Sequence, residues 1–228
     1  METSEKTLVT GRRLDGDGNP IDGTGFEYAA EGPIAEVLAA RIGPLYSNPD
    51  FGEWGVKLVE SAERFRFATV YQAGHLGVAE HFHPRYEEYL EVLQGEFRFM
   101  IDGEERLLNT GDKLDIPRGV RHGFRFAGTG YGSLLIESVP PGRLPQFLPI
   151  LVGLGQKGKL TRTGRPPLLQ ALTMAHALED DTVYTFPPPV LMRPLARLVG
   201  PQVNRFGSRR DHQRYLSDEF WEQRVEQP

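Results

Sequence analysis

The sequence predicts a mainly β protein, built as an antiparallel barrel or sandwich with an N-terminal arm and a helical C-terminal extension. Between residues 54 and 139, short runs of β-branched and aromatic residues alternate with turns rich in Gly, Asp and Pro. After Val139, the sequence Pro140-Pro141-Gly142 ends the strands, and apolar residues then recur at helical spacing. Short strands that follow one another this closely favour an antiparallel fold over a βαβ fold.

The N-terminal segment, residues 1–54, is predicted to be an arm that carries one short helix. Residues 1–25 are polar and turn-rich and show no sustained periodicity, which is typical of a loose loop. Within residues 33–42, apolar side chains recur at positions 34, 37, 38 and 42, and Pro33 stands where a first-turn proline belongs. We expect a single helix there.

Residues 55–140 carry the period of two that strands show, and we expect them to form the barrel. Phe65, Phe67 and Tyr71 fall on one face of a predicted strand, because they alternate with residues of the opposite parity. Residues 95–104 predict a further strand that ends in a tight turn at Asp102-Gly103.

Residues 141–228 are predicted to form the extension, with helices within 145–154, 167–178 and 190–199. In the second of these, apolar positions at helical spacing make one face, which we interpret as core packing. A short terminal helix capped by Ser217 is expected close to the C-terminus.

The segment 187–199 allows a further interpretation, because it mixes apolar residues with Arg193 and Arg197. It could cover the barrel mouth as a lid, form a dimer contact, or lie on a membrane surface. We favour the lid or the dimer contact over the membrane.

Composition excludes several classes of site and protein. The 228 residues include no cysteine, so a metal must be held by His, Asp or Glu and no disulfide exists. No apolar run reaches the roughly 20 residues that span a bilayer. The start of the chain lacks the apolar core of a secretory signal, so we expect a cytoplasmic protein.

The net charge of −5 hides an asymmetry along the chain. Residues 1–139 carry 14 Lys and Arg against 23 Asp and Glu, whereas residues 140–215 carry 11 against 4. The basic segment could pack on the acidic part, within one chain or across a dimer, or could meet an anionic membrane or nucleic acid. We favour packing on the acidic part, because the basic residues lack the aromatic interleaving of a nucleic-acid surface.

Two short segments carry the candidate metal ligands. His81 and His83 are two residues apart, so on a strand both imidazoles point to the same face. Downstream, Glu88 shares the parity of Leu90 and Val92, whereas Glu87 shares the parity of the charged Glu91. Strand parity therefore favours Glu88 over Glu87 as an inward carboxylate.

His122 completes this candidate site. It shares one strand face with Val120, Phe124 and Phe126, so it is expected to point into an apolar interior. A neutral imidazole there needs a partner, and the other inward imidazoles and the carboxylate are natural candidates to share a metal. A single histidine of this kind is more often a core or surface residue than a ligand. Three inward histidines together with an inward carboxylate instead favour a metal site.

The two segments resemble the paired motifs of the cupin superfamily. The first motif is HxH, four residues, Glu, six residues, Gly, and it is matched by His81, His83, Glu88 and Gly95. The second motif is Gly, five residues, Pro-x-Gly, two residues, His, and it is matched by Gly111, Pro117, Gly119 and His122. Two positions outside the ligands depart from the pattern, where His75 replaces a usual glycine and Phe126 a frequent asparagine.

The resemblance implies a jelly-roll barrel with a single centre for one divalent transition metal, held by His81, His83, Glu88 and His122. This donor set suits iron, manganese, nickel, cobalt and zinc, and the identity of the metal is left open. The set is similar to that of quercetinase-like dioxygenases, with Glu88 as both ligand and catalytic base. It lacks the two-histidine, one-carboxylate arrangement of 2-oxoglutarate oxygenases, so 2-oxoglutarate is disfavoured.

We therefore expect a dioxygenase that acts on a small aromatic or lipophilic molecule. A metal-dependent isomerase or lyase and a non-catalytic binding protein remain as alternatives, because fold and metal alone do not decide between them. Four phenylalanines either line the pocket or fill the barrel core: Phe97, Phe99, Phe124 and Phe126. The expected partners are a small-molecule ligand and a second copy of the chain in a homodimer, without nucleic acid or membrane.

Overall fold

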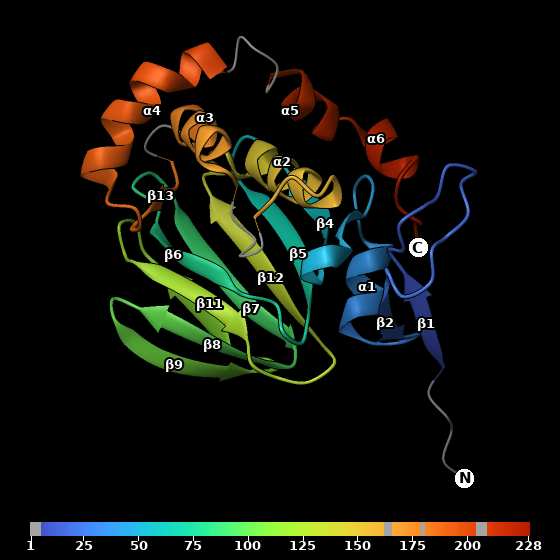
Figure 1. The fold of residues 1–228 in the computed structure, drawn as a ribbon. Helices are drawn as coiled ribbons and strands as arrows, with labels where there is room; N and C mark the ends of the chain where they lie inside the picture. The colour runs from blue at the N-terminus through green and yellow to red at the C-terminus, as the bar shows by residue number, and fades with distance from the viewer. Residues whose placement is uncertain (1–5, 162–165, 179–180, 204–208) are drawn as a thin grey trace.

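Two antiparallel sheets face each other in the computed structural model, which describes residues 6–161, 166–178, 181–203 and 209–228 (Figure 1). The six-stranded sheet has the order β10 (Lys113–Ile116), β7 (Glu87–Gln94), β12 (Tyr131–Val139), β5 (Phe65–Gln72), β4 (Glu53–Glu60) and β3 (Tyr46–Asn48). The five-stranded sheet has the order β13 (Val183–Tyr184), β6 (Val78–Phe82), β11 (His122–Phe126), β8 (Glu96–Ile101) and β9 (Glu104–Asn109). The predicted mainly β barrel is thereby confirmed.

The N-terminal segment is more ordered than the predicted loose loop. Strands β1 (Thr7–Thr10) and β2 (Phe26–Ala29) pair as a separate two-stranded sheet. Helix α1 (Pro33–Ala39) begins at the proline that predicts it. The sequence does not predict β1, because a four-residue strand that pairs across a polar loop leaves almost no periodic pattern.

The C-terminal part is helical, as predicted. Its helices are α2 (Leu144–Gln156), α3 (Leu168–Leu178), α4 (Pro189–Val203), α5 (Arg209–Tyr215) and α6 (Asp218–Glu222). Ser217 stands at the N-cap position of α6, but its side chain makes no capping hydrogen bond. Figure 1 shows α2 and α3 across one end of the barrel, with α4 beyond α3.

The extension also supplies parts of the barrel. β13 pairs with β6 at the edge of the five-stranded sheet. Trp221 of α6 is fully buried, and its ring lies edge-on to Tyr46 of β3 at 4.9 Å between centroids. Burial of such a ring contributes substantially to stability, so the last residues of the chain help to hold the first strands of the six-stranded sheet.

The division of the chain at residues 54/55 and 140/141 stays a prediction. β4 begins at Glu53 and is preceded by β3 and by the short 3-10 helix η1 (Pro49–Phe51). The strands of the six-stranded sheet therefore start before the predicted boundary.

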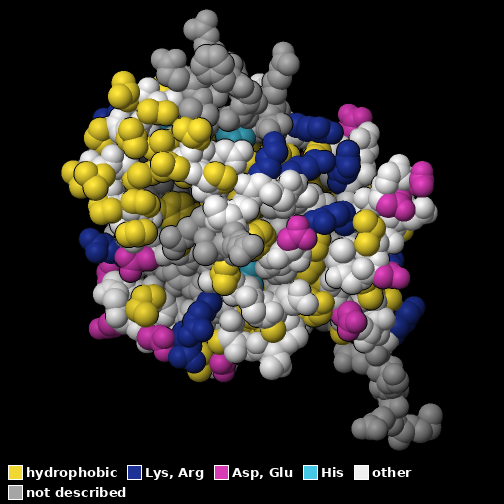
Figure 2. Space-filling model, viewed as in Figure 1, with side chains coloured by type: hydrophobic (Ala, Val, Ile, Leu, Met, Phe, Trp, Pro, Cys, Tyr) yellow, Lys and Arg dark blue, Asp and Glu magenta, His cyan; other side chains and the backbone are white. Residues whose placement is uncertain are grey.

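The surface over α3 and α4 is unusually apolar (Figure 2). Large side chains with more than half of their surface exposed gather there: Leu168, Leu169, Phe186, Val190, Leu191 and Leu198. None of the helices among the described residues is long and apolar enough to span a membrane.

Candidate metal centre

The four predicted ligands come together between the two sheets. His81 is the residue before the last of β6, and His83 follows that strand directly. Glu88 lies on β7, and His122 begins β11 opposite His81 in register. All four side chains are buried, and one donor atom of each lies within 4.8 Å of the others. This group could hold a metal ion, as strand parity predicts; its role as the ligand set stays a proposal.

The choice of Glu88 over Glu87 follows from the pleat of β7. Glu88 is 6% exposed and faces the interior together with Leu90 and Val92. Glu87 faces outward, where its carboxylate accepts a hydrogen bond from the Tyr89 hydroxyl at 2.9 Å. Successive residues of a strand point to opposite faces, so only one of the two carboxylates can reach the imidazoles.

The loop of the second motif fixes the first motif directly. The backbone N–H of Gly119 donates to the carbonyl oxygen of His83 at 2.9 Å. Gly119 has a φ of +80°, a conformation that favours glycine. The spacing of the Pro-x-Gly turn therefore positions both His122 and His83.

Each imidazole is oriented by a backbone carbonyl. The Nδ1 atoms of His81, His83 and His122 lie 2.8, 3.3 and 3.0 Å from the carbonyl oxygens of Ala79, Asp181 and Val120. Because a carbonyl only accepts, each Nδ1 carries the hydrogen, and the Nε2 lone pair is left to point at the centre.

The distances inside the group fit a shared cation better than a hydrogen-bonded cluster. His122 Nε2 lies 3.0 Å from Glu88 Oε2, and His83 Nε2 lies 3.9 Å from Glu88 Oε1. Although it is this close to the carboxylate, His122 Nε2 is buried and makes no aligned hydrogen bond. Three nitrogens and one carboxylate oxygen are a donor set for a divalent transition metal.

The ionisation states at neutral pH also suit a cation. Burial, together with the neighbouring imidazoles, lowers the pKa of His81 to about 3, and burial lowers that of His83 to about 4. Burial alone would raise the pKa of Glu88, but His122, His83 and His81 lower it to about 2. Burial opposes protonation of His122 as well, yet contact with Glu88 raises its pKa. Two neutral imidazoles and a carboxylate are thus available.

A wall formed by Tyr86 and β13 closes this centre on one side. The Tyr86 hydroxyl lies 3.1 Å from Thr182 Oγ1 and 3.5 Å from His83 Nε2. Tyr184 lies with its ring 5.5 Å from that of His81. The sequence does not predict these contacts, because about a hundred residues separate the partners. The one signal in the sequence is that Tyr86 lies inside the first motif, between His83 and Glu88.

The four phenylalanines are core residues. All four are buried, and they pack on one another between the sheets, with ring centroids 5.2–6.3 Å apart. The interpretation of these side chains as barrel core is confirmed.

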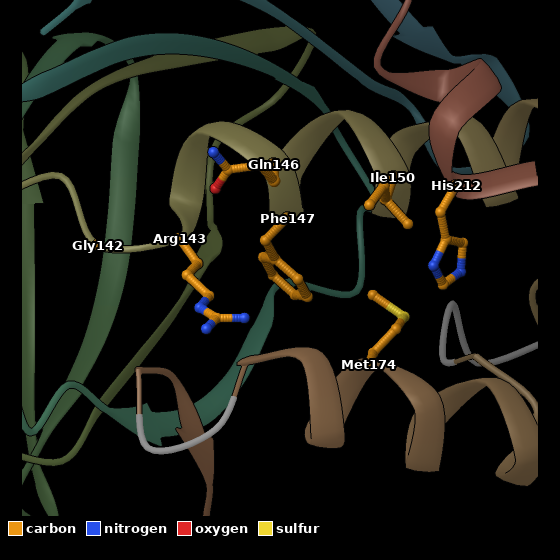
Figure 3. A pocket seen from close by; sticks show the side chains of 7 residues that line it. All are labelled: Gly142, Arg143, Gln146, Phe147, Ile150, Met174 and His212. Carbon is orange, nitrogen blue, oxygen red and sulfur yellow. The ribbon is translucent and has the colours of Figure 1, made fainter. Parts of the chain in front are cut away.

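A cavity of about 360 Å³ lies beside the wall, between α2 and α3 (Figure 3). Phe147 and Ile150 of α2, Met174 of α3 and the polar Arg143 are among its lining residues. At its edge, a Cβ added to Gly142 would lie 2.7 Å from the Tyr86 ring. Tyr86 therefore separates this cavity from the imidazole of His83.

The fold and the centre define a double-sheet β-barrel protein with a buried group of residues that could hold a metal ion. The sequence profile of the Cupin domain matches residues 67–136, which run from β5 to β12. The protein SchB of Streptomyces halstedii is 34% identical over 110 residues, which cover 48% of this chain and 70% of SchB. The chain therefore belongs to the cupin family.

Further relatives match the barrel. The polyketide synthase CurC of Streptomyces cyaneus is 39% identical over 70 residues, and the match spans 31% of this chain and 46% of CurC. Among solved structures, KdgF from Halomonas sp. is 22% identical with a TM-score of 0.37 over 39% of this chain and 79% of KdgF. An RmlC-like cupin from Shewanella frigidimarina is 24% identical with a TM-score of 0.36, covering 40% of this chain and 78% of that chain.

Proposed function

We propose that this chain is a metal-dependent enzyme that moves protons on an enolisable aromatic compound of the polyketide type. The observation that carries the proposal is the buried group of three oriented imidazoles and one carboxylate. The name of CurC, a polyketide synthase that is similar over 70 residues, supports the choice of substrate class. Polyketide intermediates carry carbonyl groups beside acidic C–H bonds, which is the chemistry that such a centre can use.

When bound, the metal would supply Lewis acidity to a substrate carbonyl. His81, His83 and His122 would hold the ion, and their Nδ1 hydrogen bonds keep the imidazoles in place. Glu88 would act as ligand and as base, because its carboxylate has two oxygens and only one is needed for the metal. The base accepts the proton from the carbon next to the carbonyl.

The surrounding side chains exclude water from the centre. Tyr86 is fully buried against His83, and β13 with Thr182 covers the edge of β6. The cavity between α2 and α3 is lined by Phe147, Ile150 and Met174 together with Arg143, Gln146 and His212. The Tyr86 ring separates it from His83, so this cavity is not itself the place where a substrate carbonyl would meet the metal.

Dioxygenation is the second candidate function, favoured by the donor set itself. Three imidazoles and one carboxylate leave up to two positions of an octahedral ion open, enough for a substrate and dioxygen. A redox metal and consumption of oxygen would distinguish this reaction from proton transfer.

A single assay separates these functions. 2′-Hydroxyacetophenone combines a metal-binding phenol and ketone with methyl protons that exchange slowly by themselves. In heavy water, the metal-loaded protein is expected to exchange these protons at the same rate with and without oxygen. The exchange should be lost in His122→Ala, whereas the control His176→Ala on α3 should retain it.

The other outcomes each contradict the proposal. Turnover that requires oxygen would establish the dioxygenase, and metal binding without exchange or turnover would favour a non-catalytic binding protein. Full metal occupancy in His122→Ala, measured on protein purified without added ions, would refute the assigned ligand set.

A further inference from the structure

Thr182 places a hydroxyl group between His83 and Tyr86. Its Oγ1 atom lies 3.3 Å from His83 Nδ1 and 3.1 Å from the Tyr86 hydroxyl. The Tyr86 hydroxyl lies in turn 3.5 Å from His83 Nε2, the nitrogen that faces the candidate metal centre. The three side chains therefore form a chain of polar contacts that starts at one ring nitrogen of His83 and returns to the other.

This chain of contacts is closed off from solvent. Tyr86, His83 and Thr182 are all buried. Polar groups in such a place satisfy their hydrogen bonds with one another, because leaving one unpaired is costly. The direction of each hydrogen bond is consequently determined by what the neighbouring group can donate or accept.

The carbonyl group of Asp181 sets this direction. It lies 3.3 Å from His83 Nδ1, and because a carbonyl only accepts, Nδ1 carries the hydrogen. Thr182 Oγ1 lies at the same distance and shares this hydrogen as a second acceptor. The hydrogen of the Thr182 hydroxyl is then left for the oxygen of Tyr86. Tyr86 accepts from Thr182, so its own hydrogen points elsewhere.

The remaining hydrogen of Tyr86 points towards the candidate centre. Among the described residues, the hydrogen-bond partners of this hydroxyl are Thr182 Oγ1 and His83 Nε2. The Tyr86 ring is stacked on the imidazole, with planes inclined by 22°, so the hydroxyl lies beside Nε2. A cation would use the Nε2 lone pair. The O–H group of Tyr86 would then be left for an oxygen atom at the centre.

We propose that the Tyr86 hydroxyl donates a hydrogen bond to the carbonyl oxygen of the substrate, and that Thr182 is the positioning residue that aims it. The inference rests on the proposed function. When Glu88 takes the proton from the carbon next to the carbonyl, negative charge develops on the carbonyl oxygen. A donor that already points at this oxygen stabilises the charge. Tyr86 keeps its proton throughout, so no oxidant or reductant is needed.

The hydrogen bond can be measured without catalysis. In cobalt-loaded protein, the visible absorption of the metal reports binding of 2′-hydroxyacetophenone. Pyridine is the matched probe, because the metal would use its one lone pair and no acceptor would be left for Tyr86. We expect Tyr86→Phe to bind 2′-hydroxyacetophenone about tenfold more weakly than the wild type, with unchanged metal content. Its affinity for pyridine should equal that of the wild type.

Substitutions at Thr182 test the direction of the hydrogen bonds. Thr182→Val keeps the shape of the side chain and removes its hydroxyl, whereas Thr182→Ser keeps the hydroxyl. We expect Thr182→Val to bind 2′-hydroxyacetophenone more weakly and Thr182→Ser to restore the wild-type affinity. Thr185→Val is the matched control, because the Thr185 hydroxyl donates to the carbonyl oxygen of Glu80 instead. It should behave as the wild type.

The exchange assay in heavy water tests the catalytic role. Tyr86→Phe is expected to lower kcat roughly a hundredfold, because the donor matters most once charge has developed on oxygen. This loss should exceed the loss of affinity for 2′-hydroxyacetophenone. Thr182→Val should lower kcat by a smaller factor, and Thr182→Ser should recover it.

The outcomes separate the two proposals. Equal affinity of wild type and Tyr86→Phe for 2′-hydroxyacetophenone would overturn the role of Tyr86 while the proposed function stands. An equal loss of affinity for pyridine would also overturn it, because the variant would then have changed the shape of the centre. Absence of exchange in metal-loaded wild type would refute the proposed function, and the catalytic role of Tyr86 with it, even if Tyr86→Phe binds 2′-hydroxyacetophenone more weakly.

Discussion

Tyr86 lies stacked on His83, with ring centroids 4.2 Å apart and planes inclined by 22°. The same tyrosine contacts Thr182, which directly precedes β13. One buried ring therefore joins a candidate metal ligand in the barrel to the helical extension. Strand β13 and the residue before it consequently belong to the structure of the site.

The hydroxyl and the ring of Tyr86 are expected to contribute differently. Tyr86→Phe keeps the stacking and removes the contact with Thr182, so it should cost about 1 kcal/mol of stability. Tyr86→Ala leaves a cavity beside His83 and should cost about 3–5 kcal/mol, with weaker metal binding. Urea unfolding and metal analysis measure both effects. Equal losses in the two variants would contradict a structural role for the ring.

Gly142 should tolerate no side chain, because of the same ring. Its φ is +56°, and an added Cβ would lie 2.7 Å from Tyr86 and 2.8 Å from Asp181 Oδ1. Gly142→Ala is expected to destabilise the fold by about 2–4 kcal/mol, from backbone strain and overpacking together. Gly130 is a matched control, since its φ is +69° and an added Cβ would meet nothing within 4 Å. Gly130→Ala should show only the cost of the backbone, about 1 kcal/mol. Similar losses in the two variants would show that the Tyr86 contact is unimportant.

The sequence predicts that the four candidate ligands face the interior, and this has a physical reason. Alternation along a strand is local, so the apolar neighbours of Glu88 and His122 reveal which way each side chain points. Tyr86 and Thr182 meet through contacts between distant segments, and nothing in their immediate neighbours signals these contacts. The sequence does not predict strand β13 either, because two residues are too few to show a periodic pattern.

Bound metal is expected to stabilise the wild-type protein. A ligand that binds only the folded state adds about 2.7 kcal/mol at a concentration 100 times its Kd. His81→Ala removes one of four donors, so the increase in Tm on adding cobalt or zinc should shrink or vanish. His176→Ala should keep the wild-type increase. A His81→Ala protein with an unchanged increase in Tm would mean that the metal binds elsewhere.

The terminal helix α6 is expected to stabilise the barrel. The buried indole of Trp221 packs on Tyr46, and its Nε1 donates to the carbonyl oxygen of Tyr215 at 2.8 Å. Trp221→Ala should cost about 3–5 kcal/mol in urea unfolding. Leu198→Ala on α4 is the control, because Leu198 is 74% exposed and should change stability by about 0.5 kcal/mol or less. If unfolding of Trp221→Ala left the barrel transition unchanged, the extension would have to be a separate unit.

Glu53 should make the stability of the fold depend on pH in a definite direction. Its pKa is raised from 4.5 to about 7 on folding, so below pH 4.5 the carboxyl is neutral in both states and has no effect. As the pH rises towards 7, the unfolded chain ionises more readily, and the free energy of unfolding falls by about 1–3 kcal/mol. Glu53→Gln cannot ionise, so it should match the wild type at pH 4 and be more stable by this amount at pH 8. Glu60→Gln serves as the exposed control. Because the measurement needs neither metal nor substrate, an unchanged difference between Glu53→Gln and wild type from pH 4 to 8 would show that Glu53 is ionised in the folded barrel at neutral pH.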